Sequence, residues 1–229
     1  MPHWFHSQRP DGTWEHTRVP ALEPAPETPV KPPSYIVGLD LGKMADYTAL
    51  SILERTGEPA CPASYRARYL KRWPLKTTYP TIVQDVAMLV GRPPLGPGTD
   101  LVIDHGGVGI AVADQFRLAR LAATLSLVTI TGGDVVHGAM EQGVMSYSVP
   151  KRELVASVTL LLQQDRLKVA PDLPEARVLV DELGAFEVRI SPSGHDSYDA
   201  RSGQHDDLVL SVALAAWFGE RPKRIAYVY

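Results

Sequence analysis

Short apolar runs and alternating stretches recur from residue 35 onward and predict five strands. Residues 35–41 and 47–54 are almost continuously apolar, and residues 63–73 alternate between apolar and basic positions. Three such strands joined by short connections indicate an antiparallel meander. Two further apolar runs, 100–104 and 124–130, flank a helical stretch. A strand–helix–strand unit of this kind predicts a parallel pair with a right-handed crossover.

Apolar positions with a helical period predict the remaining elements. Apolar residues at 82, 83, 86, 89 and 90 mark a helix over 79–90. Four more helices are expected, over 108–121, from Pro150 to about 162, over 173–183 and over 205–218. Residues 132–148 are polar and contain glycine, which favours a loop or ribbon. Residues 191–203 are rich in Gly, Ser and Asp. This order is typical of an α/β, ribonuclease H-like fold, in which helices flank a mixed five-stranded sheet of a meander and then parallel strands.

Residues 1–34 differ in composition from the rest of the chain. Prolines recur between residues 20 and 33 among Glu and Thr, with little to bury. That composition favours an extended, polyproline-like arm or linker. We therefore expect a flexible arm over 1–34 and a single domain over 35–229, a length that suffices for one well-buried α/β core.

Composition narrows the class of protein. Hydrophobic residues make up 45% of the chain and charged residues 21%, which is ordinary for a globular protein, and the net charge of −3 does not by itself indicate a nucleic-acid partner. A cluster of acidic ligands would, however, mask a basic face in that sum. The single cysteine, Cys61, excludes an internal disulfide and fits a reducing compartment. Neither a long apolar span nor a signal peptide is visible, so we expect a cytoplasmic protein without a membrane segment.

Three acidic motifs carry the candidate chemistry. Asp40 and Asp104 each close a buried apolar run, while Asp206 and Asp207 precede the apolar closing helix. A buried carboxylate is costly unless it meets a cation or good donors, and sites in such sheets gather at the carboxyl ends of strands. Asp is also a preferred helix N-cap, so one of the last two has an alternative role. We predict that Asp40, Asp104 and one of the Asp206/Asp207 pair bind metal; the pattern does not decide which of the pair does.

Carboxylate oxygens suit hard cations such as Mg²⁺ and Mn²⁺, and two such ions roughly 4 Å apart can act together on a phosphodiester. We therefore predict a two-metal phosphodiester hydrolase with those four aspartates as catalytic residues. Asp46 lies in a turn that can approach the same ions, and His105 and His205 flank the ligand candidates, where they would support a ligand or position substrate. Lys151 is at the start of a predicted helix, where a positive charge is unfavourable. A contact with a DNA phosphate would explain its position, and so would plain exposure to solvent.

Other chemistry is disfavoured. No Gly-x-x-x-x-Gly-Lys-Ser/Thr motif is present, so the chain lacks this phosphate-binding loop of ATP-driven motors. Neither His-Glu-x-x-His nor paired Cys-x-x-Cys occurs, which argues against zinc hydrolysis. The basic stretch between Arg66 and Lys76 suits either a DNA-backbone face or a solvated strand edge.

Taken together, the motifs resemble the nuclease domain of the large terminase subunit of tailed bacteriophages. The matching stretches are Gly38-Leu39-Asp40-Leu41-Gly42, Asp46-Tyr47-Thr48-Ala49, Ile103-Asp104-His105-Gly106-Gly107-Val108-Gly109, Val149-Pro150-Lys151-Arg152-Glu153-Leu154-Val155 and Gly203-Gln204-His205-Asp206-Asp207-Leu208-Val209. The resemblance implies cleavage of double-stranded concatemeric DNA with two Mg²⁺ or Mn²⁺ ions. It also implies partners in packaging: an ATPase, a small terminase subunit and a portal protein. In that family an ATPase domain normally precedes the nuclease, whereas here only the proline-rich arm does.

Three alternatives stay open at this point. A Holliday-junction resolvase shares the fold and the acidic cluster. An actin-like sugar kinase uses a Gly-Leu-Asp-Leu-Gly turn to bind ATP phosphate, although such proteins need two domains and no internal repeat is visible here. A non-catalytic module that docks onto a packaging complex through the proline-rich arm is the third.

Overall fold

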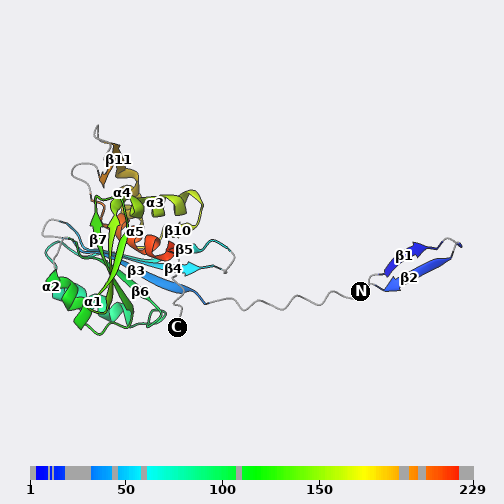
Figure 1. The fold of residues 1–229 in the computed structure, drawn as a ribbon, viewed down its shortest axis with the longest axis horizontal. Coiled ribbons are helices and arrows are strands. Elements are labelled where there is room, and N and C mark those ends of the chain that lie inside the picture. Colours follow the sequence, from blue (N-terminus) through cyan, green and yellow to red (C-terminus); the bar gives the residue numbers. More distant parts are fainter. Residues whose placement is uncertain are drawn as a thin grey trace. The chain divides into compact units, whose positions relative to one another are not determined.

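The computed structural model describes residues 4–9, 11, 13–18, 32–42, 46–57, 61–106, 110–190, 196–200 and 205–221. It divides the chain into two units, Met1–Val30 and Lys31–Tyr229 (Figure 1). In the first unit, β1 (Trp4–Gln8) pairs antiparallel with β2 (Trp14–Arg18). The segment predicted as a flexible arm over 1–34 thus contains a two-stranded hairpin, and its sequence carries a turn signal, Asp11-Gly12, between two aromatic-containing runs. The proline-rich residues 19–31 lie outside the described part of the chain.

The second unit is built on a mixed sheet with the strand order β10-β5-β4-β3-β6-β7-β9-β8. Strands β3, β4 and β5 form the predicted antiparallel meander, and β6, β7 and β9 run parallel to β3. The predicted mixed α/β architecture is confirmed. Its strands are β3 (Ser34–Asp40), β4 (Ala49–Thr56), β5 (Ser64–Arg72), β6 (Asp100–Asp104), β7 (Thr124–Thr131), β8 (His137–Glu141), β9 (Val144–Pro150) and β10 (Leu167–Val169).

Over the residues that the structure describes, the sheet has eight strands where the sequence predicted five. Strands β8 and β9 form a hairpin that occupies much of 132–148, in agreement with a ribbon there, and β9 continues to Pro150. Strand β8 is exposed at every position, so it carries no apolar face. Strand β10 has only three residues, too few for a pattern to show. A separate antiparallel pair is formed by β11 (Phe186–Ile190) and β12 (Asp196–Ala200), and β12 lies in the Gly/Ser/Asp-rich stretch 191–203. The remainder of that stretch falls outside the described residues.

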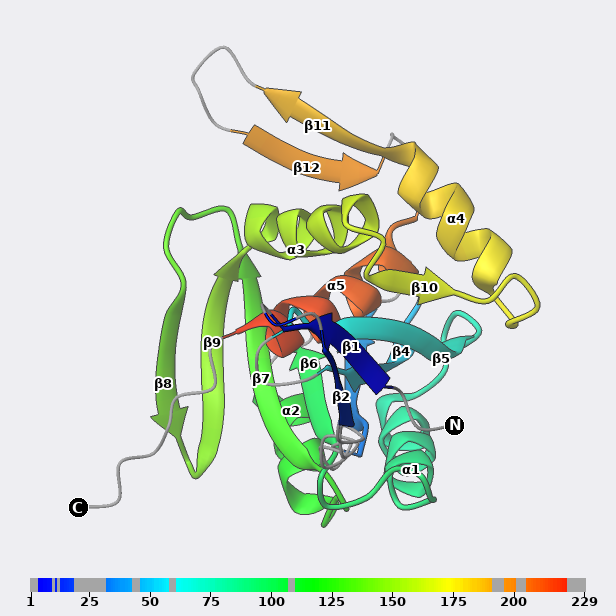
Figure 2. The ribbon, with the colours of Figure 1, turned by 90° about the vertical axis from the view of Figure 1, so that its right-hand side faces the viewer.

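Helices cover both faces of the sheet (Figures 1 and 2). One buried cluster joins α1 and α2 to the sheet through residues such as Val37 and Ile103, and a second joins α3, α4 and α5 through residues such as Ile36 and Val102. Adjacent strand residues thus point into different cores, as the pleat requires. The helices are α1 (Tyr79–Val90), α2 (Ile110–Leu118), α3 (Lys151–Gln163), α4 (Ala176–Ala185) and α5 (Asp207–Glu220). Within the described residues, no helix is long and apolar enough to cross a bilayer.

Helix α5 lies directly on the sheet because Gly38 leaves room for its backbone. A Cβ atom at Gly38 would come within 1.9 Å of the carbonyl oxygen of Ser211. The helix is buried on nearly all sides, and it packs on β3 and β4. This close approach brings the first turn of α5 to the carboxyl end of β3, where the candidate site lies.

Candidate metal centre

Asp40 and Asp104 are the last residues of β3 and β6 and lie opposite each other in register on these parallel neighbours. Adjacent strands are about 4.8 Å apart, so the two side chains begin close together. Ile36 and Val102 belong to the core beneath α5, and alternation places Asp40 and Asp104 on that same face. The sheet therefore presents both carboxylates toward the start of α5.

The first turn of α5 brings Asp206 and Asp207 to the same edge. Asp207 is buried and Asp206 is half-buried. The Nζ atom of Lys151 lies 2.9 Å from Oδ2 of Asp206. Lys151 is the first residue of α3, directly after the parallel strand β9, so it too belongs to the carboxyl edge of the sheet. The ion pair accounts for a positive charge at this helix start.

Electrostatics show that these groups act on one another. Burial raises the pKa of Asp40 well above its usual range, and the neighbouring carboxylates of Asp104, Asp207 and Asp206 raise it further, while Lys151 opposes the rise. Four carboxylates thus lie close enough at one edge of the sheet to repel one another when charged. Such a cluster is stable only if protons, cations or hydrogen-bond donors offset the repulsion.

Asp104 is held by the turn that follows it. Burial raises its pKa, and hydrogen bonds from the backbone amides of Gly106 and Ile130 and the nearby His105 lower it. The Gly106 amide donates to Oδ1 of Asp104 at 2.9 Å. His105 itself lies 3.4 Å from the Thr129 hydroxyl through Nε2. His105 therefore lies beside the cluster, and its predicted role in support or substrate contact stays a prediction.

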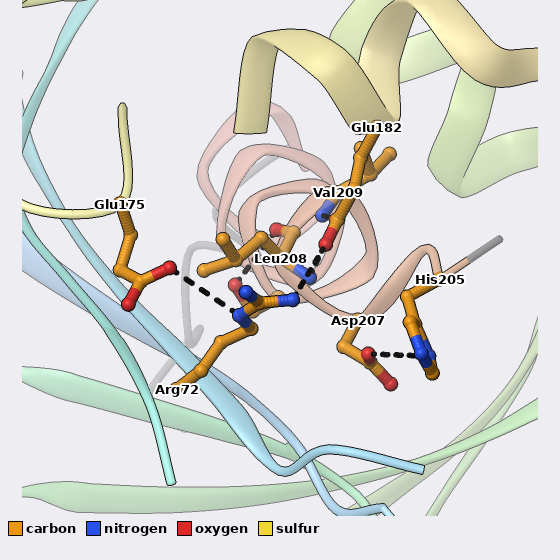
Figure 3. Close-up of polar contacts among 8 residues, drawn as sticks. Arg72, Glu175, Glu182, His205, Asp207, Leu208 and Val209 are labelled. Carbon is orange, nitrogen blue, oxygen red and sulfur yellow. Dashed lines mark hydrogen bonds and ion pairs between the residues drawn. The ribbon is translucent and has the colours of Figure 1, made fainter. Parts of the chain in front are cut away.

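Asp207 carries a buried carboxylate oxygen without a hydrogen bond. Its Oδ2 atom is buried and has no hydrogen-bond partner in the described part of the chain; Nδ1 of His205 lies 3.6 Å away, too far for a hydrogen bond (Figure 3). Burial raises its pKa to about 6; His205 lowers the value, and Asp206 and Asp46 raise it. The predicted neighbours Asp46 and His205 therefore both act on Asp207.

The donor set fits an oxygen-seeking cation, because it combines several carboxylates with a buried, unpartnered carboxylate oxygen. The ligand shell is not preassembled, however. Among the residues that the structure describes, no three His, Cys, Asp or Glu side chains are grouped so that they could hold an ion as they stand. The assignment of Asp40, Asp104, Asp206 and Asp207 as metal ligands stays a prediction.

Sequence reasoning missed Glu182. This buried residue of α4 accepts hydrogen bonds through Oε2 from the backbone amides of Leu208 and Val209, at 2.9 and 3.1 Å (Figure 3). Asp206 stands at the N-cap of α5 but makes no side-chain capping hydrogen bond. Asp206 therefore does not cap the helix through its side chain, the alternative role that was considered for one aspartate of the pair. Glu182 lies 26 residues before Leu208, so no local pattern signals the contact.

The basic stretch is mostly engaged in ion pairs within the domain. Arg66 and Arg68 lie 3.5 and 2.9 Å from Glu54, and Lys71 lies 2.9 Å from Asp85. Arg72, at the end of β5, lies 3.3 Å from Glu175 and 3.6 Å from Glu182. The Arg66 and Arg68 side chains stay 54% and 52% exposed, so the contacts are compatible with both predicted alternatives, a DNA-backbone face and a solvated strand edge.

The order and direction of the strands define the class of fold, which is ribonuclease H-like. Superposed on the magnesium-bound crystal structure of the large terminase nuclease from thermophilic phage G20c, it gives a TM-score of 0.55 at 24% identity and covers 80% of each chain. In sequence it is 29% identical over 182 residues to the large terminase subunit of Thermus phage G20c, and 28% identical to that of Thermus virus P23-45. The chain is thus similar in sequence and in fold to phage large terminase subunits, which confirms the resemblance that the motifs predicted.

The aligned segment covers 79% of this chain but only 31% of each of those two large subunits. No protein-family model matches the sequence. The homology therefore concerns about a third of the length of the full-length relatives.

Proposed function

We propose that this chain is a metal-dependent endonuclease that hydrolyses double-stranded DNA during packaging of a viral genome in the host cytoplasm. The observation that carries the proposal is the convergence of Asp40, Asp104 and the Asp206/Asp207 pair at one edge of the sheet. Homology to large terminase subunits supports the packaging role. The magnesium in the structure of the phage G20c nuclease supports a divalent cation as cofactor.

Asp40 is the central member of the cluster, because the carboxylates of Asp104, Asp206 and Asp207 all act on it. Asp40 would therefore be a ligand of both Mg²⁺ or Mn²⁺ ions, and Asp104, Asp206 and Asp207 would supply further carboxylate ligands. Bound divalent cations would supply activation of the attacking water and stabilisation of the leaving oxygen. Lys151 offsets the repulsion within the cluster and adds positive charge where a DNA phosphate would approach. A packaging ATPase, a small terminase subunit and a portal protein are the proposed partners.

Substitution of Asp104 tests the proposal directly. Asp104→Asn removes one charged ligand while keeping the size of the side chain, and we expect it to reduce Mn²⁺-dependent cleavage of plasmid DNA by about 100-fold or more. Its melting temperature in EDTA should not fall, because burial already disfavours the charged form of Asp104. Cleavage at the wild-type rate would refute the assignment.

Asp165→Asn is the matched control. Asp165 follows α3, pairs with Lys168 and has a left-handed φ of 58°, which asparagine tolerates. This variant should cleave like the wild type. Comparison of linear duplex with four-way junctions then separates a packaging nuclease from a junction resolvase. If calorimetry detects no binding of Mn²⁺ or Mg²⁺, the non-catalytic docking module becomes the better reading.

A further inference from the structure

The start of α5 is held by a residue of another helix. The backbone amides of Leu208 and Val209 are the second and third groups of the first turn, the ones that the side chain of an N-cap residue normally binds. Here Oε2 of Glu182 accepts both hydrogen bonds, while the carboxylate of Asp206 turns to Lys151. Because Glu182 of α4 caps the helix, the side chains of Asp206 and Asp207 do not have to, and both can face the other carboxylates of the site.

Arg72 holds Glu182 in turn. Its Nη1 atom lies 3.6 Å from Oε1 of Glu182, and its Nε atom lies 3.3 Å from Oε2 of Glu175 (Figure 3). The Arg72 guanidinium also lies 4.7 Å from the centre of the Tyr47 ring. Glu182 is thus fixed from the helix side by two amides and from the sheet side by a cation.

The contacts continue from Arg72 to the cluster. Tyr47 meets the ring of His205 edge-on, with the ring centres 4.9 Å apart, and His205 is the side chain that approaches Oδ2 of Asp207. Two series of contacts therefore connect Arg72 to Asp207. One runs through Glu182 and the backbone amides of α5, and the other runs through the rings of Tyr47 and His205.

We infer that Glu182 is a positioning residue: by capping α5 from α4, it sets where Asp206 and Asp207 stand relative to Asp40 and Asp104. The inference rests on the proposed function, because it concerns ligands of the proposed cation site. The geometry carries the inference: Glu182 accepts hydrogen bonds from the amides of Leu208 and Val209, so its place in α4 fixes the start of α5 directly beside Asp207.

Calorimetric titration of the full chain with Mn²⁺ tests this role. Glu182→Leu removes the acceptor, and we expect it to weaken Mn²⁺ binding by about 10- to 100-fold, the usual effect of losing a group that orients metal ligands. Glu182→Gln keeps an oxygen that can accept both amides and should bind within about 3-fold of the wild type. If Glu182→Leu binds Mn²⁺ as tightly as the wild type, the inference is overturned. Equal weakening by Gln and Leu also overturns it, because charge and not capping would then matter.

Two further variants separate positioning from general loss of stability. Leu179→Ala, in α4 itself, opens a cavity where this helix packs on the core and should lower the melting temperature, yet leave Mn²⁺ affinity unchanged. Asp181→Leu removes the neighbouring, exposed carboxylate and should also leave Mn²⁺ affinity unchanged. If either weakens Mn²⁺ binding as much as Glu182→Leu, the effect is not specific to the cap and the inference fails.

If Glu182→Leu does not fold, Glu182→Asp takes its place. Its shorter side chain cannot reach both amides, so several-fold weaker Mn²⁺ binding is expected, and wild-type affinity would overturn the inference. If the wild-type chain binds no Mn²⁺, both the proposed function and this inference are wrong. If the wild type binds Mn²⁺ and no change at Glu182 affects the affinity, only this inference is wrong.

Discussion

Glu182 holds its proton to a higher pH than an exposed glutamate does. Burial raises its pKa from the ordinary 4.5 to about 7, with the nearby Asp207 adding to the rise and the amides of α5 and Arg72 opposing it. A carboxyl whose folded-state pKa is raised favours folding while it is protonated, below its unfolded pKa, and loses that contribution as the pH rises toward the folded value. We therefore expect the free energy of unfolding in EDTA to fall by up to about 3 kcal/mol between pH 4.5 and 7.

Glu182→Gln isolates this contribution, because the other titrating groups are common to both proteins. Denaturant unfolding at a series of pH values should show a shallower decline for the Gln variant than for the wild type over that range. Parallel curves would mean that Glu182 titrates normally. The comparison needs EDTA, since a bound cation would change the charge at Asp207 as well.

Residues at strand ends were predictable, and residues that support them were not. Asp40 and Asp104 could be placed because each closes a buried run, and a sheet brings the ends of parallel strands together. Glu182 and Arg72 act through contacts between elements that are far apart in sequence. The sequence marked Arg72 only as one residue of a basic stretch. Its contact with Glu182 could not be predicted, because composition does not show which helix packs beside the end of a strand.

At the scale of elements, Gly38 decides whether α5 can lie on the sheet. A methyl group there would clash with backbone atoms of Ser211, which cannot move without shifting the helix. We expect Gly38→Ala to lower the free energy of unfolding by about 3 kcal/mol or more, within the upper range of overpacked cores. Thermal unfolding would show it as a fall of roughly 6–12 °C.

Gly184→Ala provides the contrast for Gly38→Ala. Gly184 lies in α4, with no atom within 4 Å of a Cβ placed there. Alanine should stabilise that helix by about 0.5–1 kcal/mol. If both glycine variants behave alike, the close contact between β3 and α5 does not limit stability.

Elements with a strong apolar pattern were predicted nearly to the residue. Helix α1 has the expected bounds, and the three strands of the meander begin and end within two residues of expectation. Strands β8 and β10 were missed because sheet pairing, rather than burial of an apolar face, defines them. Helix α5 was recognised by its length and apolar character, as a buried helix has no polar face to give it a period.

At the scale of the whole molecule, the order of elements was sufficient to predict the class of fold. A meander followed by strand–helix–strand units has few compact solutions, because crossovers are right-handed and both faces must be covered. The predicted boundary between arm and domain at residues 34 and 35 stays a prediction. The structure divides the chain a few residues earlier, after Val30.

Removal of residues 1–30 tests that division. The two buried clusters of the second unit draw their members from Ile36 onward, so the shortened chain keeps its entire described core. We expect a melting temperature within about 2 °C of the wild type, since every residue of the two clusters is kept, and Mn²⁺-dependent cleavage that persists. The separate peptide 1–30 should show no cooperative unfolding, because an isolated two-stranded hairpin is marginally stable in water. A large drop in melting temperature on truncation would instead make the hairpin part of the folded domain.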